Sequence, residues 1–197
     1  MNKEKIAFIP RQYLAVIAVL LAIMMSVLDG TIMNIALPTL AHDFDVTPST
    51  AIWIVNAYQL VITMTLLSFA SLGDIYGYRR IFLIGISIFV GASLACTLST
   101  SFWMLTAARV IQGFGAACVM SVNTALIRLI YPPQILGRGM GVNAMVVAVS
   151  AAAGPSIAGS ILALGSWHWL VVINIPLGLA ALVIGHRLLP HNPPAEK

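Results

Sequence analysis

Residues 102–127 read FWMLTAARVIQGFGAACVMSVNTALI. This apolar run is longer than the ~20 residues that a helix needs to cross ~30 Å of hydrocarbon. It contains one charged side chain, Arg109, and a charge at membrane depth costs roughly 2.5–3.5 kcal/mol on insertion scales. The run therefore predicts a transmembrane helix that keeps Arg109 for a partner or a water-filled path.

Five further apolar runs of comparable length surround this one. Of the 197 residues, 60% are hydrophobic and 8% are charged, and the mean hydropathy is +0.98, whereas a soluble domain is far more polar. The sequence predicts an all-α integral membrane protein, a single polytopic bundle in which Pro38 ends the first helix. The six expected helices span residues 13–37, 51–72, 81–98, 102–127, 139–164 and 169–189.

The basic residues outside the predicted helices follow a strict alternation. They flank every second connection, and the intervening connections, such as the turn from His42 to Asp45, contain none. By the positive-inside rule both termini are expected in the cytoplasm. The net charge of +4 then reflects topology, and no nucleic-acid partner is expected. The residues are Lys3, Lys5, Arg11, Arg79, Arg80, Arg128, Arg138, Arg187 and Lys197.

A second charge, Asp29, lies in the interior of the first predicted helix. Asp29 precedes Leu37 by eight residues, and Arg109 follows Phe102 by seven, which puts both roughly 10–12 Å below the outer surface. We expect the two side chains to interact, directly or through water, if their helices line one cavity. A static buried ion pair is the alternative, but buried pairs rarely stabilise more than apolar packing does. A switchable pair, in which protonation of Asp29 releases Arg109, is therefore favoured.

Other chemistries find little support in the sequence. It contains no nucleophile with a plausible base, no nucleotide-binding glycine loop and no metal-ligand cluster, so we expect neither an enzyme nor a cofactor nor a metal. Cys96 and Cys118 are predicted at different depths, which makes a disulfide between them implausible. Asn123 and Asn143 are expected to form hydrogen bonds between helices.

Two stretches resemble signatures of the major facilitator superfamily. The first surrounds Arg109 and is similar to the helix 4 motif: Leu105, Arg109, Gln112, Gly113, Gly115, Ala116 and Ala117. The second resembles the connection between helices 2 and 3, although Ala70 and Tyr78 depart from the usual pattern: Gly73, Asp74, Gly77, Arg79 and Arg80. The resemblance implies a gate in which Asp74 meets the N-terminus of a helix in a second half of the protein.

Three further motifs resemble the fourteen-helix drug:proton antiporter branch of that superfamily. Gly154, Pro155 and Gly159 are similar to the antiporter motif of helix 5, with an ordinary small-residue packing face as the alternative. The helix 1 motif is matched by Leu28, Asp29, Thr31, Asn34, Ala36, Leu37 and Pro38. The entry to helix 6, where His168 replaces the usual Arg, is matched by Trp167, Trp169, Ile173, Asn174, Pro176 and Gly178.

The resemblance implies proton-coupled efflux of lipophilic, often cationic drugs or antiseptics across a bacterial inner membrane. Asp29 would be the proton site or the counter-ion of the cation, with Arg109 as its modulator. An apolar and aromatic cavity can hold such a cation. Its weaker candidates, for which packing is an equal alternative, are Asn34, Trp53, Tyr58 and Gln112.

Superfamily members consist of two six-helix domains, each an inverted pair of three-helix repeats. The 197 residues supply one such domain, and they resemble the N-terminal half. The expected partners are the lipid bilayer, protons, lipophilic small molecules and a second six-helix half, either a C-terminal domain or another protomer. The alternatives are a truncated, non-transporting membrane protein or partner subunit, and a metabolite carrier of the same superfamily.

Overall fold

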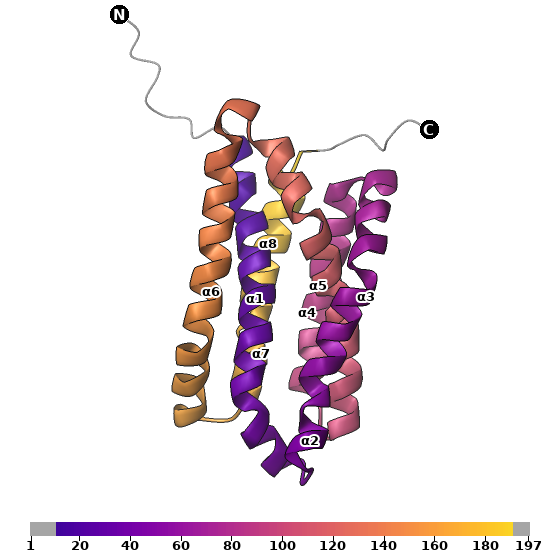
Figure 1. Cartoon of the computed structure of the whole chain (residues 1–197), viewed down its shortest axis with the longest axis vertical. Helices are drawn as coiled ribbons and strands as arrows, with labels where there is room; N and C mark the ends of the chain where they lie inside the picture. The colour runs from indigo at the N-terminus through magenta and orange to yellow at the C-terminus, as the bar shows by residue number, and fades with distance from the viewer. Residues whose placement is uncertain (1–10, 191–197) are drawn as a thin grey trace, which may run out of the picture.

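The computed structural model describes residues 11–190, and within that range the chain is a bundle of helices without strands (Figure 1). Six helical segments of the described range are long and apolar enough to cross a membrane. This confirms the predicted all-α, six-span architecture. Along the chain the elements are α1 (Arg11–Asp43), α2 (Pro48–Ala51), α3 (Trp53–Tyr76), α4 (Tyr78–Thr97), α5 (Phe102–Ile130), η1 (Pro133–Ile135), α6 (Leu136–Leu164), α7 (His168–Val172) and α8 (Asn174–Leu188).

The first helix differs from its prediction at Pro38. Instead of ending there, α1 continues through the proline to Asp43. A proline inside a helix removes one backbone hydrogen bond. Leu40 and Ala41, in the turn that follows, are buried, and Leu40 packs in an apolar cluster with residues of other helices. Such packing is the main source of helix stability. The apolar contacts of this last turn therefore outweigh the missing bond.

A single residue, Gly77, connects α3 to α4. Its φ of 95° lies in the left-handed region, which glycine adopts without the steric penalty of a Cβ. Thr47 caps the short α2 with its side chain, and Pro48 occupies the first helical turn. Both connections are tight, so the elements on either side of them are held close together.

The two described ends of the chain lie at the same end of the bundle, together with the α3–α4 turn and η1 (Figure 1). Asp43 and Asp45 belong to the connection at the opposite end. The described arginines outside the bundle interior therefore gather on one side, as the alternation predicts. Lys3, Lys5, Lys197 and the side chain of Arg11 lie outside the described residues. The gathered arginines are Arg79, Arg80, Arg128, Arg138 and Arg187.

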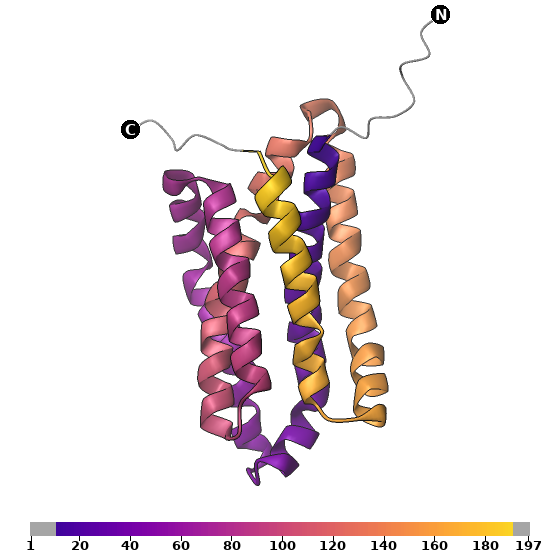
Figure 2. The same cartoon turned by 180° about the vertical axis from the view of Figure 1, so that it is seen from behind.

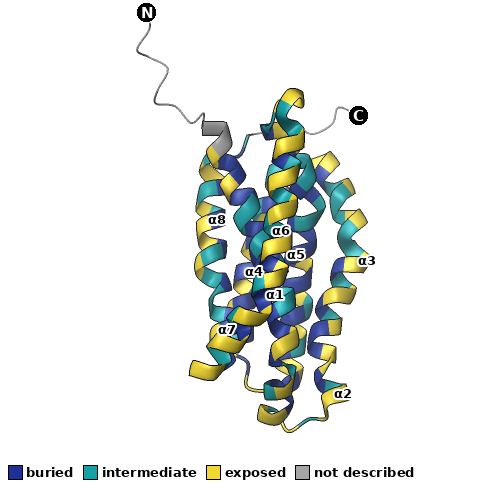
Figure 3. Ribbon diagram, turned by 60° about the vertical axis from the view of Figure 1, so that its left-hand side comes forward, coloured by how far each residue is buried: buried dark blue, intermediate teal, exposed yellow. Residues whose placement is uncertain are grey.

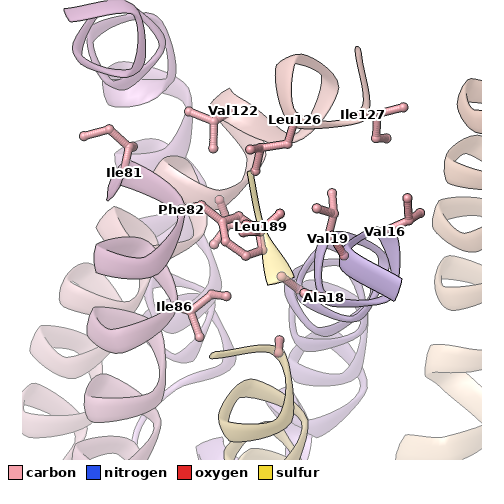
Figure 4. Packing of buried hydrophobic residues seen from close by; sticks show 14 of the residues in the cluster. Val16, Ala18, Val19, Ile81, Phe82, Ile86, Val122, Leu126, Ile127 and Leu189 are labelled. Carbon is pink, nitrogen blue, oxygen red and sulfur yellow. The ribbon is translucent and has the colours of Figure 1, made fainter. Parts of the chain in front are cut away.

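The core is centred on α1 and α5. In the most apolar 18-residue stretch of each of these helices 61% is buried, compared with 17% for the span that contains α6. Figure 3 shows α6 on the outside of the bundle, largely in the colours of exposed and intermediate residues. One apolar cluster fills the arginine-rich end and includes Phe82 of α4, Val19 of α1 and Leu189, with Phe82 and Leu189 side by side (Figure 4). A second cluster, which includes Ile32 and Leu105, fills the other end. Seen from behind, α8 lies between α4 and α1 (Figure 2).

Glycines allow the close approach of α4 and α5. A Cβ built on Gly115 would lie 2.6 Å from the backbone nitrogen of Phe89, and one on Gly85 would lie 2.5 Å from the Cβ of Cys118. No real Cβ contact is that short, so a side chain at either glycine would push the helices apart. Small residues serve this purpose at helix contacts in membranes.

We expect Gly115→Ala to lower the melting temperature of the purified protein, because overpacking a tight contact destabilises by about 1–3 kcal/mol. Gly91→Ala is the matched control, since no atom lies within 4 Å of a Cβ at that α4 position. The control variant should melt at or slightly above the wild-type temperature. Equal melting temperatures for the two variants would contradict the close packing of α4 and α5.

Candidate functional site

Asp29 of α1 and Arg109 of α5 meet inside the bundle. Arg109 Nη1 donates a hydrogen bond to Asp29 Oδ2 at 2.5 Å. The side chain of Asp29 is 1% exposed and that of Arg109 is 0% exposed. The similar depth inferred from the sequence is therefore reflected in a direct contact, and the pair lies in the packed interior of the bundle.

Two amide side chains complete the surroundings of the Asp29 carboxylate. Asn174, the first residue of α8, donates from Nδ2 to Asp29 Oδ1 at 2.7 Å. Gln112 donates from Nε2 to the same oxygen at 3.2 Å. With Arg109 these amides supply three donors to one carboxylate, and hydrogen bonds to an ionised group are stronger than neutral ones. The arrangement suits the negatively charged form of Asp29.

Gln112 joins this carboxylate to α4. Its Oε1 accepts from Arg109 Nη1 at 2.6 Å, and its Nε2 also donates to Ser93 Oγ at 2.9 Å. Gln112 is fully buried in the packed interior, whereas the sequence predicts it as a cavity residue. We call Asp29, Ser93, Arg109, Gln112 and Asn174 the Asp29 network.

Tyr58 of α3 covers the other side of Arg109. The guanidinium carbon lies 4.1 Å from the centroid of the Tyr58 ring, and Tyr58 Oη donates to the Ser26 carbonyl oxygen at 3.3 Å. Within residues 11–190, Arg109 Nε and Nη2 have no hydrogen-bond partner. The cation–π contact is thus the interaction that this part of the guanidinium makes, and such contacts strengthen when desolvated.

A cleft of about 230 Å³ lies beside the Asp29 network, with walls from α1, α3 and α5. Its lining includes Gly30, Asn34, Tyr58, Gln59 and Met120. Tyr58 therefore touches the cleft as well as Arg109. Of the predicted cavity residues, Asn34 and Tyr58 line this cleft.

Trp53, a third predicted cavity residue, does not line the cleft. It is 53% exposed at the start of α3. Its indole lies on the outside of the bundle, where tryptophan commonly marks a membrane interface.

The predicted gating residues lie at the arginine-rich end. Asp74 is exposed and accepts a hydrogen bond from Tyr78 Oη at 2.5 Å. Arg79 Nη2 donates to the His186 carbonyl oxygen at 2.5 Å, which ties α4 to the last turn of α8. Arg80 is exposed. The exposed Asp74 at the end of α3 and the exposed Arg80 at the start of α4 thus flank Gly77 in the sequence.

Gly73 precedes this group and has a packing role. A Cβ there would lie 2.9 Å from Val122 Cγ1 of α5. The absence of a side chain lets the end of α3 rest on α5, which holds the Gly77 turn in place.

The three residues of the predicted antiporter motif separate in the structure. Gly154 is buried against Thr31 of α1, and a Cβ there would collide with the Thr31 side chain. Pro155 and Gly159 are exposed, and α6 continues through the proline. Gly154 therefore serves the contact of α6 with α1, whereas a Cβ built on Gly159 would point into open space.

Several polar residues behave as the sequence suggests, and two were missed as site residues. Cys96 and Cys118 are free and buried, and Asn123 Nδ2 donates to Asn143 Oδ1 at 2.9 Å between α5 and α6. Ser93 and Asn174 belong to the Asp29 network without having been assigned a role. The signal in the sequence that could have identified Ser93 and Asn174 is that each is a polar side chain within an apolar run. No metal-binding group of three His, Cys, Asp or Glu residues occurs among the described residues.

Comparison with known proteins places this geometry in a family. The profile of the Major Facilitator Superfamily matches residues 19–197. The uncharacterized transporter YebQ of Escherichia coli strain K12 is 58% identical over 93% of this chain and 40% of its own length. The riboflavin transporter RibZ of Clostridioides difficile is 36% identical over 91% of this chain and 40% of its own length. The tetracenomycin C resistance and export protein of Streptomyces glaucescens is 37% identical over 91% of this chain and 33% of its own length.

Solved structures agree on the fold. A bacterial homologue of the human lysosomal transporter Spinster, inward-facing and unoccupied, aligns with a TM-score of 0.76 over 96% of this chain and 45% of its own, at 17% identity. The chain thus spans less than half of this structure and about two fifths or less of the sequence relatives above. Because the profile covers nearly all 197 residues, the chain belongs to the Major Facilitator Superfamily, whose members are transporters and not enzymes.

Proposed function

We propose that this six-helix bundle carries the proton site of an exporter that exchanges protons for lipophilic cations across a bacterial inner membrane. The observation that carries the proposal is the buried Asp29–Arg109 pair beside a cleft with an aromatic wall. The tetracenomycin C relative, named as a resistance and export protein, supports an export function. Asp29 is the proton site in this proposal, and Arg109 is its modulator.

Protonation of Asp29 changes the energy of the whole network. It would leave the Arg109 charge buried without its counter-charge, which is strongly unfavourable at a site of 0% exposure. Any arrangement that gives Arg109 a new partner or access to water then becomes the favoured one. Proton binding can bias a conformational equilibrium in this way because it affects the two arrangements differently.

The cleft suits an amphipathic cation. The Tyr58 ring, Ile62 and Met120 offer aromatic, aliphatic and polarisable surface, and Asn34 and Gln59 offer amides. Gly30 brings the cleft to the residue next to Asp29 in the sequence. A cation held there is attracted by the ionised carboxylate and repelled by Arg109, so proton and cation oppose each other's binding.

We further propose that a second six-helix half, a C-terminal domain or another protomer, completes the binding site. The cleft of about 230 Å³ is smaller than the roughly 300–1,000 Å³ of typical ligand sites. A second half facing the cleft would supply the remaining walls. Asp74, exposed near the Gly77 turn, is the proposed gate contact to that half.

A metabolite carrier is the second candidate, favoured by the 36% identity to a riboflavin transporter. A non-transporting membrane protein or partner subunit is the third. In the metabolite case Asn34 and Gln59 would read polar groups of a neutral substrate, and binding would not depend on the charge of Asp29. In the non-transporting case, binding of an amphiphile would be accompanied by no flux driven by a pH gradient.

The binding test uses the purified chain and a fluorescent lipophilic cation. We expect affinity to rise with pH, because only ionised Asp29 attracts the cation, and we expect binding to release protons into a weakly buffered solution. Asp29→Asn should bind at least about tenfold more weakly, with no pH dependence. Asp45→Asn is the control, because this exposed carboxylate lies at the end of the bundle. Binding by the wild type that does not change with pH would contradict the proposal and favour a neutral substrate.

A flux test addresses the second half. Everted vesicles that contain only the monomeric chain should show no proton movement when the lipophilic cation is added, as read by a pH-sensitive dye. The reason is that one wall of the site is missing. If flux occurs, cross-linking should reveal paired protomers, and Asp29→Asn should abolish the flux. Flux from a chain shown to be monomeric would disprove the need for a second half.

The proposed orientation places both termini and the arginine-rich end in the cytoplasm. Single cysteines introduced at Arg80 and at Asp45, in a Cys96→Ala, Cys118→Ala background, test it by labelling with a membrane-impermeant maleimide. We expect labelling from outside the cell at position 45 and only after permeabilisation at position 80. The reverse pattern would invert the proposed topology.

A further inference from the structure

Asn174 has a buried oxygen that the network leaves unused. Its side chain is fully buried, and its Nδ2 donates to Asp29 Oδ1 at 2.7 Å. Within residues 11–190 its Oδ1 accepts no hydrogen bond. Most buried polar atoms in proteins are paired, so an unpaired one calls for an explanation. The orientation itself is dictated by charge, because turning the oxygen toward the ionised carboxylate would be repulsive.

The chemistry of the carboxyl group supplies that explanation. An ionised carboxylate only accepts hydrogen bonds, whereas the protonated acid has an O–H that must donate. Asp29 faces three donors, on Arg109, Gln112 and Asn174. Protonated Asp29 would need an acceptor. Gln112 Oε1 is already engaged by Arg109 Nη1 at 2.6 Å and by Cys96 Sγ at 3.6 Å. Among the side chains bonded to Asp29, Asn174 Oδ1 is therefore the acceptor that remains.

We propose that Asn174 is a positioning residue that serves both protonation states of Asp29. It donates from Nδ2 to the carboxylate, and when Asp29 takes up a proton the amide turns so that Oδ1 accepts from the acid O–H. This inference rests on the proposed function, in which Asp29 is the proton site, and adds the residue that holds the proton in place.

The other titratable groups near Asp29 offer no competing acceptor. Arg109 from α5 carries donors only. Tyr58 from α3 directs its hydroxyl to Ser26, and Cys96 from α4 directs its thiol to Gln112. The remaining ionisable side chains of α6, α7 and α8 lie near helix ends, at Arg138, His168, His186 and Arg187.

The turning of the Asn174 amide also affects the contact between α1 and α8. Asn174 begins α8 directly after Ile173, which separates α8 from α7. Two residues later, Pro176 has no N–H to donate to the preceding turn. When the amide turns, the bond between α1 and α8 reverses its donor and acceptor. A proton on Asp29 is therefore transmitted to the start of α8 as well as to α5.

The test is infrared difference spectroscopy of the purified chain in lipid over a pH titration. Loss of a carboxylic-acid band in Asp29→Asn assigns that band to Asp29. In Asn174→Leu, which nearly preserves the side-chain shape, we expect the pH midpoint of the Asp29 band to differ from that of the wild type, because the charged and neutral forms of Asp29 lose bonds of different strength. The acid band should also move to higher wavenumber, because the O–H loses its acceptor.

Asn123→Leu is the matched control. It removes an equally interhelical amide, bonded to Asn143, from a site outside the Asp29 network. Midpoint and band should stay at their wild-type values in this variant. A wild-type midpoint and band in Asn174→Leu would overturn the role of Asn174 and leave Asp29 as the proton site. Absence of any titrating band that depends on Asp29 would overturn both.

A measurement on the wild-type fold guards against misfolding of the leucine variant. With isotope-labelled asparagine, one side-chain carbonyl band should shift to lower wavenumber with the same midpoint as the Asp29 band, because Asn174 Oδ1 begins to accept. The shift should vanish in Asp29→Asn. An asparagine spectrum that does not change while Asp29 titrates would overturn the exchange.

Discussion

A carboxylate and a guanidinium buried in one hydrogen bond constrain the rest of this bundle. The 2.5 Å contact between Asp29 and Arg109 requires α1 and α5 to keep their relative height and rotation. Lipid cannot solvate either group, so the protein must supply every partner. Amides from α5 and α8 do so at Asp29, and the Tyr58 ring does so at Arg109. The apolar clusters on either side seal this polar layer from the ends of the bundle.

The helical spans and the depth of the charged pair could be predicted from the sequence because both depend only on distance along the helix axis. Hydrocarbon thickness fixes how long an apolar run must be, and a rise of ~1.5 Å per residue fixes where a charge lies along it. Rotation about the helix axis is a different quantity, set by packing against neighbours. For that reason Gln112 was expected in a cavity but lies in the buried network, and Asn174 was not identified as a partner of Asp29. Pro38 shows the same limit, because only tertiary contacts reveal that Leu40 and Ala41 hold the helix together beyond it.

The sequence signatures contain two physically different kinds of residue. Gly77, Gly115 and Gly154 are required by geometry: a left-handed φ at the first, and a helix contact closer than a Cβ allows at the other two. Asp29 and Arg109 form a buried ion pair, a kind of contact that rarely stabilises a protein more than apolar packing does. Their presence is therefore the stronger argument for function, while the glycines are the stronger argument for fold. Gly159, where a Cβ would point into open space, belongs to neither kind here.

The separation of the cleft from the carboxylate bears on how exchange could be coupled. Asp29 lines no part of the cleft, whereas Tyr58 lines it and also lies under Arg109. In the proposed exchange, a cation in the cleft would thus act on the charge of the network from a neighbouring position, without itself contacting the Asp29 carboxylate. If proton and cation shared one oxygen, binding would be exclusive but need not move a helix. In the proposed exchange, with two adjacent positions joined through Arg109 and Tyr58, each ligand would act on the other by changing where Arg109 is most stable. Arg109 is attached to α5, so this indirect competition requires a change in packing, and a transporter can use such a change to open one side of the membrane and close the other.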